Sequence, residues 1–351
     1  MGKFLDEVRD QPDRLRFLVE RYENGQMERV HRAGEILADN SSRIVFTGMG
    51  TSYFCPIAIK GRLLDAGYYP EIYEAGELLH YYDDALTDCS LVAISQSGES
   101  AETRKVLAGS WPDQAKISVT NDPDSTIAQE SDLNLEIYAG EERSISNKTY
   151  TNTLAVLLIL AEVLDGGSGE KALDNLTGCA DSLATFLREK SDRIEACADF
   201  LGVPTFTHFV SRGPSMTAAR QGALTFNEGA RIFTQALPGG SFRHGPLEVT
   251  GENHRIVMLA PEGRTYKLLE KVALEAASAG SKVAFITDAT VLEKVSAADN
   301  VFPVQLKSSL PEEYFPMLSS IPVEMLLNKL AENKGLEAGV FTRVTKVTTE
   351  E

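Results

Sequence analysis

A cluster of polar side chains in the first half of the chain has the composition of an anion site. The apolar run at positions 91–94 is typical of a strand, and the turn after it leads into a predicted helix. Hydroxyl groups and free backbone N–H groups at the start of a helix favour a dianion such as phosphate. A serine here could instead cap the helix, but a cap needs one hydroxyl. The turn offers an amide and three hydroxyls, from Gln96, Ser95, Ser97 and Ser100, so we expect it to bind phosphate.

A second turn could serve the same ligand. A β-branched run leads into Gly48-Met49-Gly50, and Thr51 and Ser52 follow at the start of the next predicted helix. Their hydroxyls either cap that helix or contact the ligand, and both alternatives stay open. The glycines lack the third member of the dinucleotide-binding fingerprint, so we exclude that function.

Two side chains in the second half have the chemistry of proton transfer. Glu228 follows the apolar helical run 223–226, so its carboxylate should lie at the edge of the interior, where burial can raise its proton affinity. One carboxylate beside two adjacent carbons can carry a proton between them. His244 lies in the glycine-rich segment 239–246, which lets the backbone approach a ligand. The alternatives are a solvated helix glutamate and an ordinary surface histidine.

One supersecondary plan, which occurs twice, must position these residues. The strand, glycine turn and helix start around Gly50 recur around Gly213. A Gly-to-His segment, two strands and an apolar helix then follow in the same order in both copies. The paired segments are 76–80 and 240–244, 91–94 and 256–259, 116–120 and 282–287, and 151–164 and 316–331. Strands that alternate with helices predict parallel sheets covered by helices.

We therefore predict an α/β protein of two tandem doubly wound parallel-sheet domains. The predicted divisions are an N-terminal helical segment at 1–31, a first domain with the serine turn at 32–167, a helical linker at 168–200, and a second domain with the C-terminal tail at 201–351. Ligands of such sheets bind beyond the carboxyl ends of the strands. The loops after Thr47, Ile94 and Thr120 should therefore converge.

Composition argues against several classes of function. The 351 residues exceed what one hydrophobic core usually spans, and the net charge of −17, from 34 basic and 51 acidic residues, disfavours nucleic acid binding. No apolar run reaches the ~18 residues of a membrane span and no apolar leader follows Met1, so we expect a cytoplasmic protein without membrane contact.

The four cysteines are scattered and should be reduced, buried thiols. Because no cluster has metal-ligand spacing, we expect neither a metal nor another cofactor.

The chain resembles the sugar-isomerase (SIS) domain family, in particular the isomerase half of glucosamine-6-phosphate synthase. The resemblance rests on Gly50-Thr51-Ser52, on 95–103, on 223–228, and on 240–247 with its His-Gly-Pro-Leu string. The C-terminal stretch 343–348 is a further likeness. Together these stretches extend over roughly residues 30 to 350.

The resemblance implies a role for each of these residues. Glu228 would move a proton between C1 and C2 of the sugar, and His244 would assist ring opening from the neighbouring subunit of a homodimer. The phosphate of a hexose 6-phosphate would be held by the two turns, and the sugar would be contacted further by Ser146. The residues carried over to substrate binding are Gly50, Thr51, Ser52, Ser95, Gln96, Ser97, Ser100 and Ser146.

The chain departs from the family pattern at two places. Asn227 stands where the synthase has a lysine, so one positive charge near the sugar is missing. The family's tail carries a lysine that can form an imine with the open-chain sugar, and Arg343 aligns with it here. Arginine stays protonated and cannot be that nucleophile. Either Lys346, three residues further on, takes the role, or the imine step is absent.

The implied activity is that of a phosphosugar isomerase or deaminase working on a small-molecule sugar phosphate through an enediol or enolamine. The synthase takes nitrogen from glutamine in a separate N-terminal domain, and no segment of this sequence corresponds to it, so we expect chemistry without a glutaminase. The alternatives are a deglycase of a sugar-amine 6-phosphate and a non-catalytic sugar-phosphate-binding regulator. A regulator needs the serine turn but not the base, so Glu228 and His244 favour an enzyme.

Overall fold

The structure, a computed structural model, describes residues 2–110, 114–343, 345, 346, 348 and 350. These residues form two compact units, each with its own sheet. The N-sheet unit comprises Asp13–Glu142, Lys148–Thr177 and the tail from Arg343. The C-sheet unit comprises the residues up to Pro12, Arg143–Asn147 and Gly178–Thr342. The first helix, α1 (Lys3–Arg21), contributes residues to both units.

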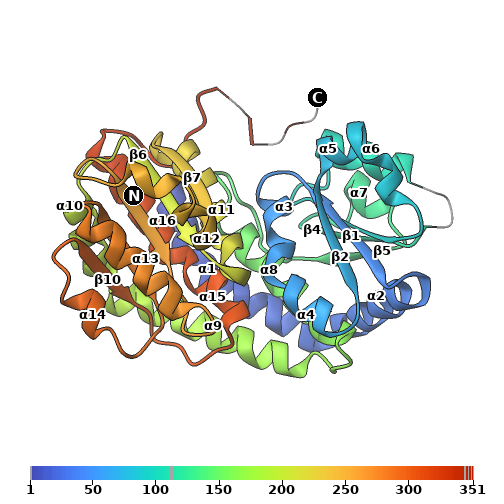
Figure 1. The fold of residues 1–351 in the computed structure, drawn as a ribbon. Helices are drawn as coiled ribbons and strands as arrows, with labels where there is room; N and C mark the ends of the chain where they lie inside the picture. Colours follow the sequence, from blue (N-terminus) through green and yellow to red (C-terminus); the bar gives the residue numbers. More distant parts are fainter. Residues whose placement is uncertain (1, 111–113, 344, 347, 349, 351) are drawn as a thin grey trace. The chain divides into compact units, whose positions relative to one another are not determined.

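The N-sheet unit is built on a parallel sheet with the strand order β2-β1-β3-β4-β5 (Figure 1). Helices α5, α6 and α7 cover one face, and α2, α3, α4 and α8 pack on the other side. The strands are β1 (Arg43–Gly48), β2 (Tyr69–Glu74), β3 (Ser90–Ile94), β4 (Lys116–Thr120) and β5 (Leu133–Glu136). The helices are α2 (Met27–Asn40), α3 (Thr51–Phe54), α4 (Lys60–Asp65), α5 (Ala75–Tyr81), α6 (Ala101–Gly109), α7 (Thr126–Gln129) and α8 (Lys148–Leu164).

The register of this sheet brings three strand ends to one edge. Gly48 of β1 pairs with Ile94 of β3, and Ile94 pairs with Val119 of β4. Because the three strands are adjacent and parallel, the loops that leave them lie next to one another, as the sequence predicted. The apolar runs of β1 and β3 are buried on both faces, which is the usual state of a parallel strand between two helix layers.

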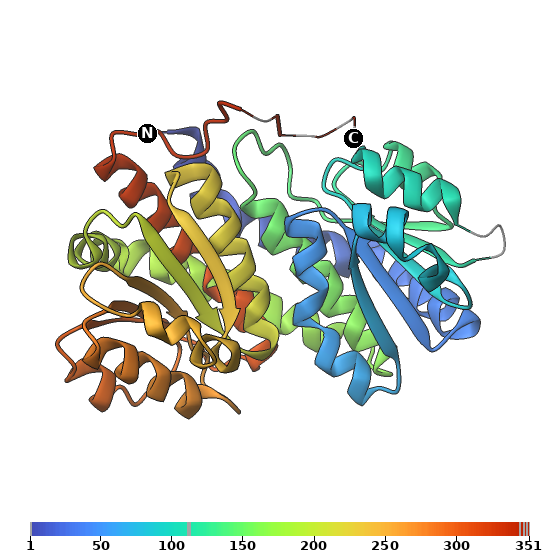
Figure 2. The same ribbon diagram turned by 45° about the horizontal axis from the view of Figure 1, so that its top comes forward.

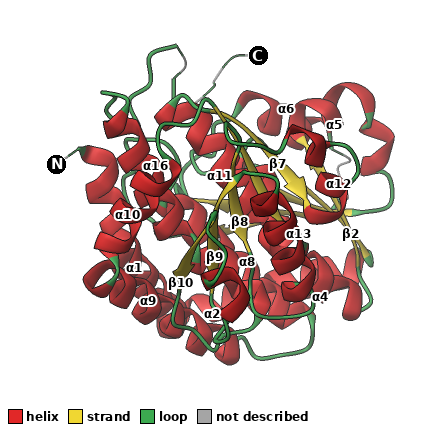
Figure 3. Ribbon diagram, turned by 60° about the vertical axis from the view of Figure 1, so that its left-hand side comes forward, coloured by secondary structure: helices red, strands yellow, loops and turns green. Residues whose placement is uncertain are grey.

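The C-sheet unit repeats this plan with the order β7-β6-β8-β9-β10, again all parallel (Figures 2 and 3). Helices α10, α11 and α16 pack on one side and α12, α13 and α14 on the other. The strands are β6 (Phe206–Ser211), β7 (Phe233–Pro238), β8 (Arg255–Leu259), β9 (Lys282–Thr287) and β10 (Val301–Gln305). The helices are α10 (Ser191–Leu201), α11 (Met216–Thr225), α12 (Gly239–Arg243), α13 (Tyr266–Ser278), α14 (Glu293–Ser296), α15 (Phe315–Leu318) and α16 (Ser320–Asn333). Helix α9 (Glu170–Glu189) begins in the N-sheet unit and continues in the C-sheet unit. The matching strand orders confirm the predicted pair of doubly wound domains.

The interior of each unit is apolar and closely filled. In the N-sheet unit, Val45, Leu91 and Ala93 are fully buried against α5 and α6. The four cysteines are free and buried, as predicted. Burial raises the pKa of the Cys197 thiol to about 12, so the thiol is protonated at neutral pH and unreactive. No helix within the described residues has both the length and the apolar character needed to cross a membrane.

Candidate functional site

The serine loop, residues Ser95–Ser100, connects the carboxyl end of β3 to the start of α6. The hydroxyls of Ser95 and Ser100 lie 3.2 Å apart. The Ser95 hydroxyl also accepts a hydrogen bond from the Gly98 N–H at 3.1 Å, and the Ser97 hydroxyl accepts one from the Glu99 N–H at 3.1 Å. The loop is thus a tight turn in which two of the three predicted hydroxyls are in direct contact.

Ser100 stands at the N-cap of α6 without capping it. Its backbone is extended (φ −60°, ψ 125°), as an N-cap residue requires, but its side chain makes no capping hydrogen bond. A capping serine would accept a hydrogen bond from an N–H of the first helical turn. The Ser100 hydroxyl instead pairs with Ser95. Simple helix capping, the alternative raised by the sequence, therefore does not account for this serine.

Two neighbours of the hydroxyls hold the serine loop in shape. Gly98 has φ +65°, and a Cβ at this position would overlap the side chain of Ser125, so a glycine is required. The Glu99 carboxylate accepts hydrogen bonds from the Thr126 N–H at 2.7 Å and the Thr126 hydroxyl at 3.0 Å, and it pairs with Arg104 at 3.3 Å. The negative charge of Glu99 is therefore balanced locally at the start of α7.

The second predicted turn lies at the same sheet edge. Gly50 is the N-cap of α3 with φ +50°, so Thr51 and Ser52 are inside the helix and neither is its N-cap. Both are half-buried. β1 and β3 approach closely here, because a Cβ on Gly48 would overlap the carbonyl oxygen of Ile94. Of the two alternatives left open for these hydroxyls, the structure removes N-capping of α3, and contact with a ligand stays a prediction.

Glu228 lies in a single π-helical turn, η5 (Phe226–Ala230), directly after α11. The residue is half-buried, which agrees with the predicted position at the edge of the interior. Gly229 is packed tightly, since a Cβ there would overlap the side chains of Ile145 and Leu327. Single π turns occur frequently at functional sites because they offset a side chain from the regular helical face.

Asn227, which replaces the lysine of the family pattern, has a structural role in the C-sheet unit. Its amide donates to the carbonyl of Ala223 at 2.8 Å, and its carbonyl accepts from the Thr234 N–H at 3.2 Å. The side chain therefore ties the end of α11 to β7. This contact fixes the turn that carries Glu228.

His244 ends the short helix α12 and is exposed. The preceding helix is anchored by Phe242, a fully buried ring whose centroid lies 5.3 Å from that of His208 and 6.2 Å from that of His254. Gly245, with φ +121°, turns the chain immediately after His244. The histidine is thus presented to solvent from a well-anchored turn.

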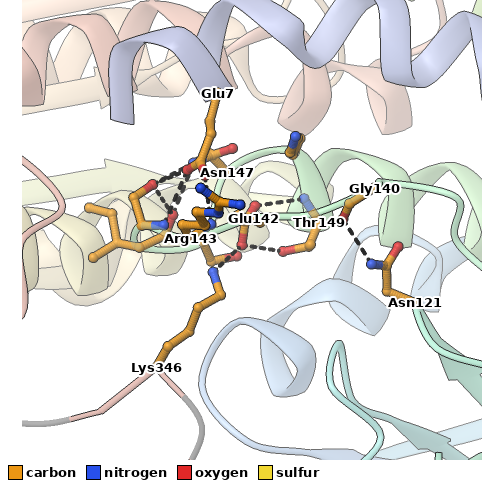
Figure 4. A network of polar contacts seen from close by, with 12 residues as sticks. Glu7, Asn121, Gly140, Glu142, Arg143, Asn147, Thr149 and Lys346 are labelled. Atoms are coloured by element: carbon orange, nitrogen blue, oxygen red, sulfur yellow. Dashed lines mark hydrogen bonds and ion pairs between the residues drawn. The ribbon is translucent and has the colours of Figure 1, made fainter. Parts of the chain in front are cut away.

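The loop 143–147 carries the remaining predicted substrate contact, Ser146. Its carbonyl accepts from the side-chain amide of Gln221 at 3.1 Å. The same loop is held by Glu7, whose carboxylate accepts from the Arg143 N–H at 2.6 Å and from the side chain of Asn147 at 3.3 Å (Figure 4). Burial tends to raise the pKa of Glu7, but the hydrogen bonds from Ser144, Arg143 and Asn147 together lower it.

The tail residues left open by the sequence differ in their surroundings. Arg343 is exposed, whereas Lys346 is half-buried in the N-sheet unit and donates from Nζ to Glu142 Oε1 at 2.8 Å. The carbonyl of Thr348 accepts from the Ala101 N–H at 3.2 Å, at the first residue of α6. Glu142 was not singled out from the sequence. No local signal indicates it, because Lys346 lies 204 positions further along the chain.

The loop of the C-sheet unit that corresponds to the serine loop has lost the serines, and carboxylates from other segments approach it. Asp288 accepts from the Glu262 N–H at 2.7 Å, and the Glu312 carboxylate lies directly over Gly263. Burial, with the nearby carboxylates of Glu262 and Glu312, raises the pKa of Asp288 to about 6. Such a turn repels a dianion, so the two copies have diverged in what they can bind.

Within the described residues, no group of three or more His, Cys, Asp and Glu side chains is arranged to hold a metal ion.

The model of the SIS domain family matches residues 36–163 and 208–331, which together make up more than half of the chain. The chain belongs to the SIS domain family. The first match contains the whole N-sheet with the complete serine loop, and the second contains the C-sheet from the third residue of β6 onward.

This SIS protein is similar to larger curated proteins and to several solved structures. It is 30% identical over 341 residues to the glutamine–fructose-6-phosphate aminotransferase (isomerizing) of Pyrococcus horikoshii, covering 94% of this chain and 55% of the relative. The chain thus spans about half the length of the curated relatives it matches. The C-terminal domain of glucosamine-fructose-6-phosphate aminotransferase from Francisella tularensis superposes with a TM-score of 0.84 at 22% identity, covering 97% and 98% of the two chains. Glucosamine-6-phosphate deaminase from Thermotoga maritima gives 0.74 at 18% identity, covering 99% of both.

Proposed function

We propose that this SIS protein is a phosphosugar isomerase or deaminase that acts on a hexose 6-phosphate or an amino sugar 6-phosphate through an enediol or enolamine. The observation that carries the proposal is the serine loop, whose N-cap serine leaves the helix uncapped and turns its hydroxyl to Ser95. The names of its relatives, which state fructose 6-phosphate and glucosamine 6-phosphate, support this substrate class.

The phosphate role belongs to the edge of the N-sheet. The hydroxyls of Ser95, Ser97 and Ser100, the amide of Gln96 and the start of α6 offer donors to the phosphate oxygens. The turn with Gly50, Thr51 and Ser52 extends this set. Because these donors act at short range, the net charge of −17 does not prevent anion binding.

The proton-transfer role belongs to Glu228. Isomerisation between an aldose and a ketose removes a proton from one of two adjacent carbons and returns it to the other, so a single carboxylate suffices. When the substrate carries an amino group at C2, the same proton transfer converts the enolamine to an imine, which water hydrolyses to the ketose and ammonia. A half-buried carboxylate on a packed π turn suits this role because its position is fixed while one edge stays accessible.

His244 is proposed to assist ring opening, as a donor or acceptor to the ring oxygen and the anomeric hydroxyl. Its exposure on an anchored turn supports a contribution to the site of a second copy in a homodimer. A catalytic histidine that is exposed in one chain needs a partner surface to become part of a water-excluding site.

The deciding experiment is proton NMR in heavy water with the purified protein. Glucosamine 6-phosphate is incubated alone, and fructose 6-phosphate is incubated with ammonium, which tests amination without requiring a glutaminase. Deuterium should enter at C1 or C2. The Glu228→Gln variant should abolish this exchange, whereas Glu248→Gln, a change at an exposed glutamate of the same unit, should leave it intact.

Three outcomes would change the assignment. Sugar phosphate that binds without any exchange would favour a regulator. Exchange that appears only with a sugar-amine conjugate would favour a deglycase. Exchange that is unaltered in Glu228→Gln would remove Glu228 from the role of the base.

A further inference from the structure

Glu142 is a buried carboxylate to which none of the roles above has been assigned. Its side chain is 1% exposed, and its Oε1 accepts the ammonium of Lys346 at 2.8 Å (Figure 4). Lys346 keeps 22% of its side chain exposed. The pair therefore consists of an interior anion and a cation that still reaches the surface.

The carboxylate is fixed by the start of α8 independently of Lys346. The Thr149 N–H donates to Oε2 at 3.0 Å, and the Thr149 hydroxyl donates to Oε1 at 2.9 Å. Thr149 is the second residue of α8, so the partial positive charge of the helix start also favours the anion. Glu142 is thus a rigid anchor, while Lys346 comes from the tail.

An anchor of this kind restricts a flexible amine strongly. A lysine side chain has four rotatable bonds and loses substantial rotamer entropy when it is held in one place. A buried carboxylate also makes a stronger partner than an exposed one, because water screens the attraction less. The structure therefore gives the tail amine one defined position, set by Glu142.

We infer that Glu142 is a positioning residue, which holds the Lys346 amine in the place from which it adds as a nucleophile to the open-chain sugar. The inference rests on the proposed function. In the step concerned, the ammonium gives one proton to the solvent and the neutral amine adds to the carbonyl carbon. The carbinolamine then loses its hydroxyl group and the remaining nitrogen proton as water, which leaves an imine between Lys346 and the sugar.

The first test measures the amine without any sugar. The 351-residue chain is labelled with a trace of acetic anhydride at one fixed pH, and the rate at which Lys346 is labelled is followed by mass spectrometry. Glu142→Gln keeps the shape and an acceptor for Thr149 but removes the charge. Lys346 should be labelled faster in Glu142→Gln than in the wild-type protein, because the amine is no longer held by the buried charge. Glu141→Gln, at the exposed neighbouring glutamate, is the matched control and should show no change in rate.

The second test measures the step on the sugar. Borohydride reduction with fructose 6-phosphate should trap an adduct at Lys346. Glu142→Gln should trap less of this adduct even though its amine is labelled faster, because the amine is no longer held in position. An unchanged labelling rate overturns the inference, and so does faster labelling with unaltered trapping. If deuterium exchange occurs but nothing is trapped at Lys346, the proposed function stands and the role of Glu142 falls. If labelling becomes faster in Glu142→Gln but neither exchange nor trapping occurs, the ion pair is real and the proposed function fails together with the positioning role.

Discussion

Replacing Ser100 by alanine separates two roles that a serine at the start of a helix can have. A capping serine stabilises the protein and has no effect on ligands, whereas a binding serine contributes to affinity and little to stability. In this protein the Ser100 hydroxyl makes no cap to α6 and lies 3.2 Å from the Ser95 hydroxyl. We therefore expect Ser100→Ala to weaken the binding of sugar phosphate and to leave the fold unchanged.

The magnitude follows from the chemistry of the bond. A hydrogen bond to a charged acceptor contributes about 1.5–3 kcal/mol, and every 1.4 kcal/mol corresponds to a tenfold change in Kd. The Kd for a sugar phosphate should rise roughly 10- to 150-fold. Loss of a helix cap would cost about 1 kcal/mol of the free energy of unfolding, and we expect a loss well below this value.

The assay combines titration calorimetry with urea unfolding of the same preparations. Fructose 6-phosphate and inorganic phosphate are both titrated, because a phosphate contact should weaken the two ligands alike. Ser278→Ala is the matched control, since Ser278 is the exposed last residue of α13 and its hydroxyl donates to the carbonyl of Glu275 at 2.8 Å. The control should change neither measurement appreciably.

One pattern of results would refute the reasoning. If Ser100→Ala lowers the free energy of unfolding by about 1 kcal/mol while Kd changes less than twofold, the serine is a helix cap in solution. The serine loop would then lose the observation that carries the proposed function.

Three further predictions concern the C-sheet unit. Glu228→Gln should lower kcat by about 10²- to 10⁴-fold with little change in KM, because the base acts in the transition state. Steady-state kinetics measures both constants, and a change in KM alone would argue that Glu228 has a binding role. If each site takes its histidine from the partner, mixing inactive Glu228→Gln and His244→Ala subunits should restore about a quarter of the wild-type activity. The reason is that about half of the dimers contain one subunit of each kind, and one of the two sites in such a dimer is intact. No recovery of activity would place both residues in the site of one subunit. His208 and His254 are buried with ring nitrogens 2.9 Å apart, and burial, aided by the His208 and Arg255 charges, lowers the pKa of His254 from 6.5 to about 4. Below pH 6.5 the unfolded chain therefore binds more protons than the folded chain, so the free energy of unfolding should fall as the pH is lowered from 6.5 to about 4. Urea unfolding at a series of pH values measures this fall. An equally steep fall in His254→Gln would show that His254 is not its cause.

Much of the fold could be predicted because the central strands carry continuous apolar runs. β1, β3, β4, β8 and β9 were located from such runs, and the structure buries them between helix layers. The edge strands escaped prediction for the opposite reason. β2 and β7 are half exposed and mix polar with apolar residues, and β10 contains Pro303, which an edge strand tolerates.

The candidate site could be predicted only in part, and the division has a physical cause. Hydroxyls at a strand-to-helix turn are local, so the serine loop is visible in the sequence. Whether Ser100 caps its helix depends on the position of its side chain within the turn, which the sequence left open. The anchor of Lys346 was missed entirely, because Glu142 and the tail are more than two hundred positions apart and meet only in the folded unit.

The sequence by itself determined the repeated parallel-sheet plan, the family, and the residue types available for phosphate binding and proton transfer. These follow from periodicity and from motifs in which neighbours in the chain are also neighbours in space. The tertiary structure decided that the Ser100 hydroxyl does not cap its helix and that the Glu312 carboxylate lies over Gly263. It also decided that Lys346 is the tail amine held by a buried carboxylate. Such contacts join distant segments, and their existence depends on burial and on packing, which no local pattern specifies.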